Sequence, residues 1–142
     1  MREIKFRGKR KDNGEWIFGG AVCNTSGEVF IEAIDFYHTM VHPETVGQYT
    51  GLTDKNGVKI FEGDILRRSF TDSFKKTHST KCLITFERGC FMINRTENPP
   101  VLMYRWHFCE DYEMFTKGNG YFEVVGNIHD NPELLKREGG AE

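Results

Sequence analysis

The sequence predicts a mainly β fold contained in a single domain. Short runs that alternate apolar and polar residues recur along the chain, and they are separated by Gly, Asn and Asp turn residues. Gly is abundant, at 15 residues, and Ala is scarce, which favours turns over helices. The 12 Phe, 5 Tyr and 2 Trp supply large side chains for a core, and 142 residues is a common domain size. We therefore expect one domain over residues 1–142, built from antiparallel strands.

The first part of the chain has the pattern of an antiparallel meander. Residues 4–7 alternate apolar and charged side chains, as a half-buried strand does. Asn13-Gly14 and the Asn24 to Gly27 stretch supply the reversals that separate the following runs. Strands are predicted over residues 4–7, 16–22 and 28–31.

The stretch from Gln48 to Leu66 predicts strand, turn, strand, turn and strand. Asn56-Gly57 accepts the positive φ angles that favoured hairpin turns require. Gly63 permits the second bend, and the carboxylate of Asp64 is placed to accept backbone N–H bonds within it. We interpret Asn56, Gly57, Gly63 and Asp64 as structural turn residues that fix the register of the strands.

The second half alternates clear strands with segments that have no periodic pattern. The stretch from Thr71 to Lys81 is polar and basic and has no strand pattern, so a flexible loop is expected within residues 66–81. Residues 101–116 fit either a strand pair or a short helix. Asn131 as N-cap and Pro132 at the first helical position predict a short C-terminal helix, followed by a frayed tail over 137–142. Further strands are expected over 65–70, 81–87, 90–95 and 121–128.

Three blocks stand in order along the chain: residues 4–9, residues 51–65 with the sequence GLTDKNGVKIFEGDI, and residues 126–135 with the sequence GNIHDNPELL. Together they resemble the YopX family of small bacteriophage and prophage proteins. The resemblance implies a complex, mainly β fold that contains a partly open antiparallel β-barrel. It also implies a phage or prophage gene expressed in the bacterial cytoplasm, and it brings no catalytic residue or cofactor. Residues 66–81 and 97–117 show no match.

The net charge of −2 is unevenly distributed along the chain. Residues 1–20 hold six Lys and Arg against three acids, and residues 66–81 hold five bases against Asp72 alone. Residues 110–142 hold eight acids against three bases. The pattern fits solvated loops of opposite sign, head-to-tail contacts between subunits, or a local basic patch for phosphate.

Hydropathy and cysteine spacing predict a cytoplasmic protein. No apolar run reaches the roughly 18–20 residues of a membrane span, and the first residues lack the apolar stretch of a signal peptide. The four Cys are then expected to be reduced, and no pair has the spacing Cys-x-x-Cys. We interpret them as small buried apolar residues.

No catalytic, cofactor or metal site is predicted. His107 and Cys109 have strand spacing and would share one face, but Cys82 and Cys90 would have to complete a zinc site without the usual close pairs. His129-Asp130 is better explained as part of a turn that closes the last strand and caps the terminal helix. A last group of carboxylates is interpreted as a solvated loop: Glu110, Asp111 and Glu113.

The sequence favours a non-enzymatic accessory protein that acts through protein–protein contacts. Open strand edges and charge segments of opposite sign make a homo-oligomer the expected state, with a host or phage protein as a further partner. The alternative is a nucleic-acid-binding module, because basic residues interleaved with aromatics hold single strands by stacking and phosphate contact. The residues of this alternative are Arg67, Arg68, Phe70, Phe74, Lys75 and Lys76.

Overall fold

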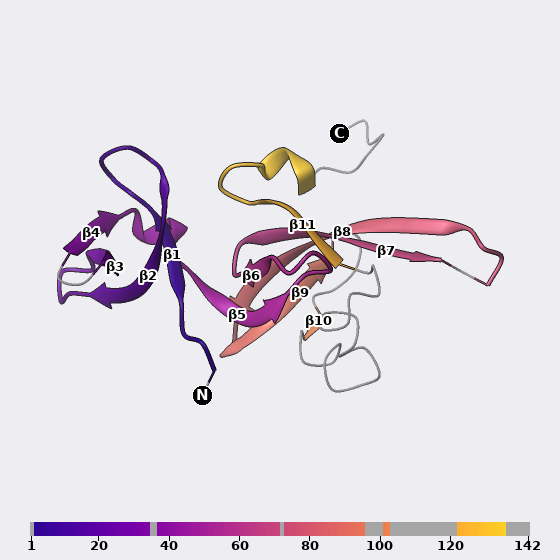
Figure 1. Cartoon of the computed structure of the whole chain (residues 1–142), viewed down its shortest axis with the longest axis horizontal. Coiled ribbons are helices and arrows are strands. Elements are labelled where there is room, and N and C mark those ends of the chain that lie inside the picture. Colours follow the sequence, from indigo (N-terminus) through magenta and orange to yellow (C-terminus); the bar gives the residue numbers. More distant parts are fainter. Residues whose placement is uncertain (1, 35–36, 72, 96–100, 103–121, 136–142) are drawn as a thin grey trace. The chain divides into compact units, whose positions relative to one another are not determined.

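The fold is mainly β, as the sequence predicts, with strands in two antiparallel sheets (Figure 1). The computed structural model describes residues 2–34, 37–71, 73–95, 101–102 and 122–135. The chain divides into two compact units, Met1–Gly51 and Leu52–Glu142. The boundary falls inside a strand, so the strand pattern in the sequence gives no sign of this division.

The first unit is a meander of four strands. They are β1 (Phe6–Lys9), β2 (Trp16–Cys23), β3 (Val29–Ile34) and β4 (Tyr37–Val41), each antiparallel to the next. Ile31 and Val41 are fully buried. The chain after β1 also meets β4, because Lys11 N–H donates to Met40 O at 3.1 Å and His42 N–H donates to Lys9 O at 2.8 Å. A short 3-10 helix, η1 (Pro43–Thr45), follows.

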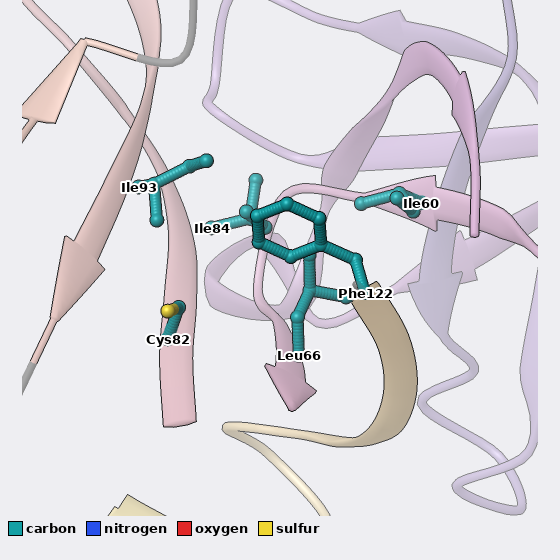
Figure 2. Close-up of a cluster of buried hydrophobic side chains, with 6 residues drawn as sticks. All are labelled: Ile60, Leu66, Cys82, Ile84, Ile93 and Phe122. Atoms are coloured by element: carbon teal, nitrogen blue, oxygen red, sulfur yellow. The ribbon is translucent and has the colours of Figure 1, made fainter. Parts of the chain in front are cut away.

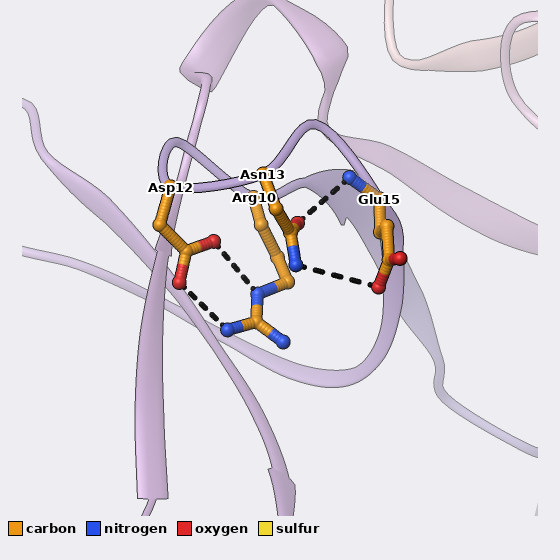
Figure 3. Close-up of polar contacts among 4 residues, drawn as sticks. All are labelled: Arg10, Asp12, Asn13 and Glu15. Atoms are coloured by element: carbon orange, nitrogen blue, oxygen red, sulfur yellow. Dashed lines mark hydrogen bonds and ion pairs between the residues drawn. The ribbon is translucent and has the colours of Figure 1, made fainter.

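The turn between β1 and β2 is held by side chains on its surface (Figure 3). The Arg10 guanidinium donates to both carboxylate oxygens of Asp12, at 2.9 and 2.7 Å. This hydrogen bond lowers the pKa of Asp12 and raises the pKa of Arg10. The side chain of Asn13 accepts from Glu15 N–H at 2.9 Å, as a short polar side chain does in a turn.

Strand β5 (Gly47–Thr53) continues the first sheet, whose strand order is β4-β3-β2-β1-β5-β6. Gln48 is the partner of Phe6 on β1. The turn at Asp54 to Gly57 then leads into the short strand β6 (Lys59–Phe61). Gly57 has a φ of 80°, the positive value expected of this Asn-Gly turn.

The second unit holds a five-stranded antiparallel sheet in the order β10-β9-β8-β7-β11. Side chains from β6 and from four of these strands meet in one buried cluster (Figure 2): Ile60, Leu66, Cys82, Ile84, Ile93 and Phe122. Because all six are fully buried, this cluster anchors the second unit. The strands are β7 (Asp64–Thr71), β8 (Thr77–Glu87), β9 (Cys90–Arg95), β10 (Val101–Leu102) and β11 (Phe122–Asn127).

The expected flexible loop over residues 66–81 is instead most of a β-hairpin. Strands β7 and β8 pair from Ile65 and Leu83 out to Thr71 and Thr77. The sequence does not reveal these strands because both contain several Ser and Thr residues. A composition rich in Ser and Thr is typical of loops. β-Branched Thr nevertheless favours extended backbone, and hydroxyl pairs across strands are stabilising.

The last block of the sequence closes strand β11 with a network of hydrogen bonds. Asn127 Oδ1 accepts from His129 N–H at 3.0 Å and from Asp130 N–H at 2.9 Å. Asn131 Oδ1 accepts from Asn127 N–H at 3.3 Å, so its side chain reaches back toward the strand. A 3-10 helix follows, η2 (Pro132–Leu135). The predicted short C-terminal helix is present only as this 3-10 turn, no barrel is found among the described residues, and the tail over 137–142 lies outside them.

Candidate nucleic-acid interface on a basic ribbon

The outer part of the β7–β8 hairpin forms a two-stranded ribbon. Within the described ranges, strand β11 pairs with β7 only as far as Arg68, and β9 pairs with β8 only from Cys82 onward. Among these residues, Ser69–Thr71 and Thr77–Lys81 therefore find strand partners only in the β7–β8 pair itself. Figure 1 shows β7 and β8 continuing together beyond their neighbours to a turn. We call Arg67–Lys81 the β7–β8 ribbon.

The register of this hairpin assigns side chains to two faces. Residues directly opposite each other in an antiparallel pair lie on the same face, and alternate residues along a strand share it. Arg67 is paired with Lys81, Ser69 with Ser79, and Thr71 with Thr77. One face thus carries two cations at its base and four hydroxyl side chains beyond them. We call these six residues the hydroxyl face.

The base of the hydroxyl face combines two cations with the neighbouring carboxylate of Glu123. Arg67 and Lys81 lie opposite each other, an arrangement in which like charges repel. Glu123 on β11 lies beside them, with its Oε2 3.9 Å from Arg67 Nη1 and 3.8 Å from Lys55 Nζ. These are long, half-exposed ion pairs, which contribute little stability. The Arg67 side chain keeps 47% of its surface exposed, so it remains accessible to an anion.

The tip of the ribbon presents an aromatic ring beside two lysines. Phe74 is 89% exposed, the most exposed of the large apolar side chains described. Lys75 and Lys76 are exposed next to it, and Lys75 has a φ of 62°. A ring this exposed contributes little to the core and is accessible to a ligand.

The structure brings most of the predicted nucleic-acid residues into one ribbon, but not onto one face. Arg67, Phe74, Lys75 and Lys76 are exposed along it. Arg68 is half-buried on the opposite face, and its Nε is buried. Phe70 lies in β7 opposite His78, and its side chain is outside the described set.

Sequence reasoning missed Lys81 and the hydroxyl row. The sequence places Lys81 at the start of the strand after the expected loop, whereas the pairing places it beside Arg67. The alternation of Thr77, Ser79 and Lys81 was the available signal, because residues two apart in a strand share a face.

A second basic and aromatic group lies in the first unit, and its cations are already engaged. The Arg7 guanidinium lies over the Trp16 ring, 4.6 Å from its centroid, and Lys9 Nζ lies 5.4 Å from the same centroid. Arg7 is only 7% exposed. These cation–π contacts and the burial of Arg7 indicate a structural role, whereas Arg67, Lys75 and Lys76 of the ribbon are exposed.

The turn residues predicted from the sequence lie around two buried carboxylates. Asp54, 3% exposed, accepts from Asn56 N–H at 2.8 Å, from Val58 N–H at 2.9 Å and from Val124 N–H at 2.9 Å. These bonds direct both of its oxygens at backbone, which is a structural role rather than a catalytic one.

Asp64 is buried in the second turn, and it also accepts a backbone bond. Its Oδ2 receives Phe61 N–H at 2.8 Å. Gly63, with a φ of 91°, donates its N–H to Ile84 O at 2.7 Å and accepts from Ile128 N–H at 2.9 Å. The second turn is therefore bonded to two other segments of its unit.

The described residues hold no group of three or more His, Cys, Asp and Glu side chains that would suit a metal ion. Cys82 belongs to the buried cluster, Cys90 is half-buried and Cys23 is exposed. His129 and Asp130 donate backbone N–H groups within the turn after β11. The remaining candidates lie outside the described residues: His107, Cys109, Glu110, Asp111 and Glu113.

Across the part of the chain that is described, no helix has the length and apolar character of a membrane span.

Comparison with known proteins supports the family resemblance. Residues 5–136 match the family described as YopX protein, a range that includes both units and the ribbon. Among solved structures, the chain is similar to one titled "Crystal structure of protein EF1440 from Enterococcus faecalis". The TM-score is 0.59 at 26% sequence identity, over 96% of this chain and 100% of that chain. The comparison with curated proteins finds no match.

Proposed function

This chain belongs to the YopX family, and we propose that it is a non-enzymatic phage or prophage accessory protein that binds nucleic acid through the β7–β8 ribbon. One observation carries the proposal: a ribbon with five Lys and Arg against one Asp has an 89% exposed Phe at its tip. Cations and hydroxyls contact phosphates, and an exposed ring contacts bases. The expected setting is the cytoplasm of a bacterial host.

The overall charge of −2 does not oppose this proposal, because the interaction is local. Screening limits charge effects at the surface to about 8 Å at physiological ionic strength. The strands rise about 3.3 Å per residue, so the tip lies well beyond that distance from the base of the ribbon. A phosphate at the tip therefore experiences Lys75 and Lys76 far more than Glu123, the carboxylate at the base of the ribbon.

The test is fluorescence anisotropy with labelled DNA and RNA at two salt concentrations. Lys75→Ala/Lys76→Ala should weaken binding about tenfold or more, since fewer neutralised phosphates release fewer counterions. The matched control is Arg2→Ala/Lys11→Ala, which removes two exposed charges from the first unit. Equal losses of affinity in the two double variants, or no binding at low salt, would overturn the proposal.

A finer feature of the fold is also proposed, namely that β1 to β4 form the partly open barrel. The backbone bonds from Lys11 to Met40 and from His42 to Lys9 support it, because they join β4 to the chain leaving β1. Slow amide exchange at Lys11 and His42 is expected if this closure persists in solution. Exchange as fast as in an open loop would contradict it.

A second candidate function is self-association through the β3–β4 tip. Ile34 and Tyr37 are opposite each other there and are 70% and 72% exposed. A second copy is the proposed occupant, since the basic segments and the acidic 110–142 segment of two chains have complementary charge. Sedimentation equilibrium should show a homo-oligomer that Ile34→Ser/Tyr37→Ser dissociates. Weak association is ordinarily detectable at protein concentrations of tens of micromolar. A wild-type protein that is monomeric at such concentrations would exclude self-association.

A further inference from the structure

We infer that the β7–β8 ribbon is built for the major groove of double-stranded B-form DNA, with the hydroxyl face toward the base edges. This inference rests on the proposed function, and it names the class of nucleic acid and the face that meets it. Three properties of the ribbon lead to it: its shape, the size of the side chains on one face, and the positions of its cations.

The shape of the ribbon suits a groove. Beyond Arg68 it is only two strands wide among the described residues, and neighbouring strands lie about 4.8 Å apart. The major groove of B-form DNA is about 12 Å wide and admits a two-stranded ribbon. The major groove of duplex RNA is deep and narrow, so the same ribbon is excluded from it.

The hydroxyl face suits the floor of that groove. Ser69, Ser79, Thr71 and Thr77 are all short, so the backbone of the ribbon can come close to base edges. A hydroxyl group both donates and accepts a hydrogen bond, and it therefore fits any of the four base pairs. The expected binding to duplex DNA is consequently weakly selective for sequence.

The cations lie at the two ends of this face. Arg67 and Lys81 are at its base, and Lys75 and Lys76 are at its tip. At about 3.3 Å per residue, the two groups are separated by roughly 15–20 Å. In a ribbon that lies along the groove, this separation lets the two groups contact phosphates at two points along the groove walls.

The single exposed ring argues against a single strand as the preferred ligand. Proteins that hold single strands stack successive bases on several aromatic side chains. Here Phe74 is the one exposed aromatic at the described part of the tip, and the hydroxyl face offers no stacking surface. At the edge of a major groove, Phe74 instead supplies an apolar contact for a thymine methyl group.

The experiment compares two substitutions of equal charge on opposite faces of the ribbon. Ser79→Glu places a carboxylate on the hydroxyl face, and Thr80→Glu places one on the other face, at the next residue of the same strand. Both positions are exposed, so both variants should fold. Anisotropy is measured with a 20-base-pair DNA duplex, an RNA duplex of equal length and single-stranded DNA.

We expect DNA duplex to bind most tightly, and Ser79→Glu to weaken it at least about tenfold more than Thr80→Glu. Equal weakening by the two variants, or equal affinity for duplex RNA, would overturn the groove assignment. Preference for single-stranded DNA, abolished in Phe74→Ala, would overturn it while leaving the proposed function intact. Absence of binding to all three ligands at low salt would overturn both.

Discussion

Two hairpin turns in the second unit differ in what their side chains do. The β5–β6 turn closes on Asp54, a buried carboxylate that accepts three backbone N–H groups, one of them from β11. The β7–β8 turn ends in the exposed side chains of Phe74, Lys75 and Lys76. The first turn buries a carboxylate that bonds to backbone, whereas the second carries exposed cations and an exposed aromatic ring.

This difference separates residues that hold the fold from residues available for binding. Substitutions around Asp54 should lower the free energy of unfolding, because they remove bonds that other strands depend on. Substitutions at the ribbon tip should leave that free energy unchanged and alter ligand affinity. The following experiments test this separation.

The largest effect is expected from Asp54→Ala. It removes an acceptor that satisfies three N–H groups, so we expect a decrease of about 3 kcal/mol or more in the free energy of unfolding. Urea denaturation monitored by tryptophan fluorescence measures it. Asp54→Asn keeps one carbonyl acceptor, so its free energy of unfolding should decrease less than that of Asp54→Ala. Equal decreases in the two variants would show that the charge alone matters.

Gly63→Val should have the next largest effect. Gly63 has a φ of 91°, which side chains rarely adopt, and the strain costs about 1–3 kcal/mol. Val is β-branched, so it should be worse than Gly63→Ala. Thermal melting gives the comparison, and a midpoint unchanged by Val would refute the structural role of this turn.

Two phenylalanines, one in β8 and one just before it, compare a residue that holds the fold with a residue available for binding. Phe86→Ala removes an edge-to-face contact with Phe91, whose ring centroid is 5.1 Å away, and should cost about 1 kcal/mol. Phe74→Ala should change stability by less than about 0.5 kcal/mol, because its ring is exposed. If Phe74→Ala were the more destabilising of the two, the tip would be a structural element.

The smallest effect is expected at the exposed β1–β2 turn. The hydrogen bond from Arg10 lowers the pKa of Asp12, so the carboxylate stabilises the folded state above the ordinary pKa of aspartate. That contribution is lost as pH falls through the lowered pKa. Asp12→Asn should therefore be slightly less stable than the wild type at pH 7 and equal to it in strong acid. A difference that persists there would point to another cause.

The sequence predicts the fold well where turn chemistry is local. Asn56-Gly57 and Gly63-Asp64 lie where the turns were expected, because a positive φ depends on the residue itself. The partner of Asp54 could not be predicted, since Val124 lies 70 residues away along the chain. Only the folded sheet brings that N–H group to the carboxylate.

The sequence predicts which residue types make up the candidate site, but not how those residues are arranged on the ribbon. Basic and aromatic residues between 67 and 76 are visible in the sequence, yet their distribution over two faces depends on the register of the hairpin. That register pairs Arg67 with Lys81 and separates both from Arg68. A stretch rich in Ser, Thr and Lys resembles a loop until its cross-strand partners are known.

The most direct test of the central claim is the salt dependence of duplex DNA binding by the wild type and by Arg67→Ala/Lys81→Ala. If the ribbon binds phosphates at its base, the slope of log K against log salt concentration should become shallower by about 1 to 2 in the double variant. The free energy of unfolding should stay within about 1 kcal/mol of the wild type, since Arg67 is exposed and Lys81 is only partly buried. An unchanged slope in a folded variant would contradict the account.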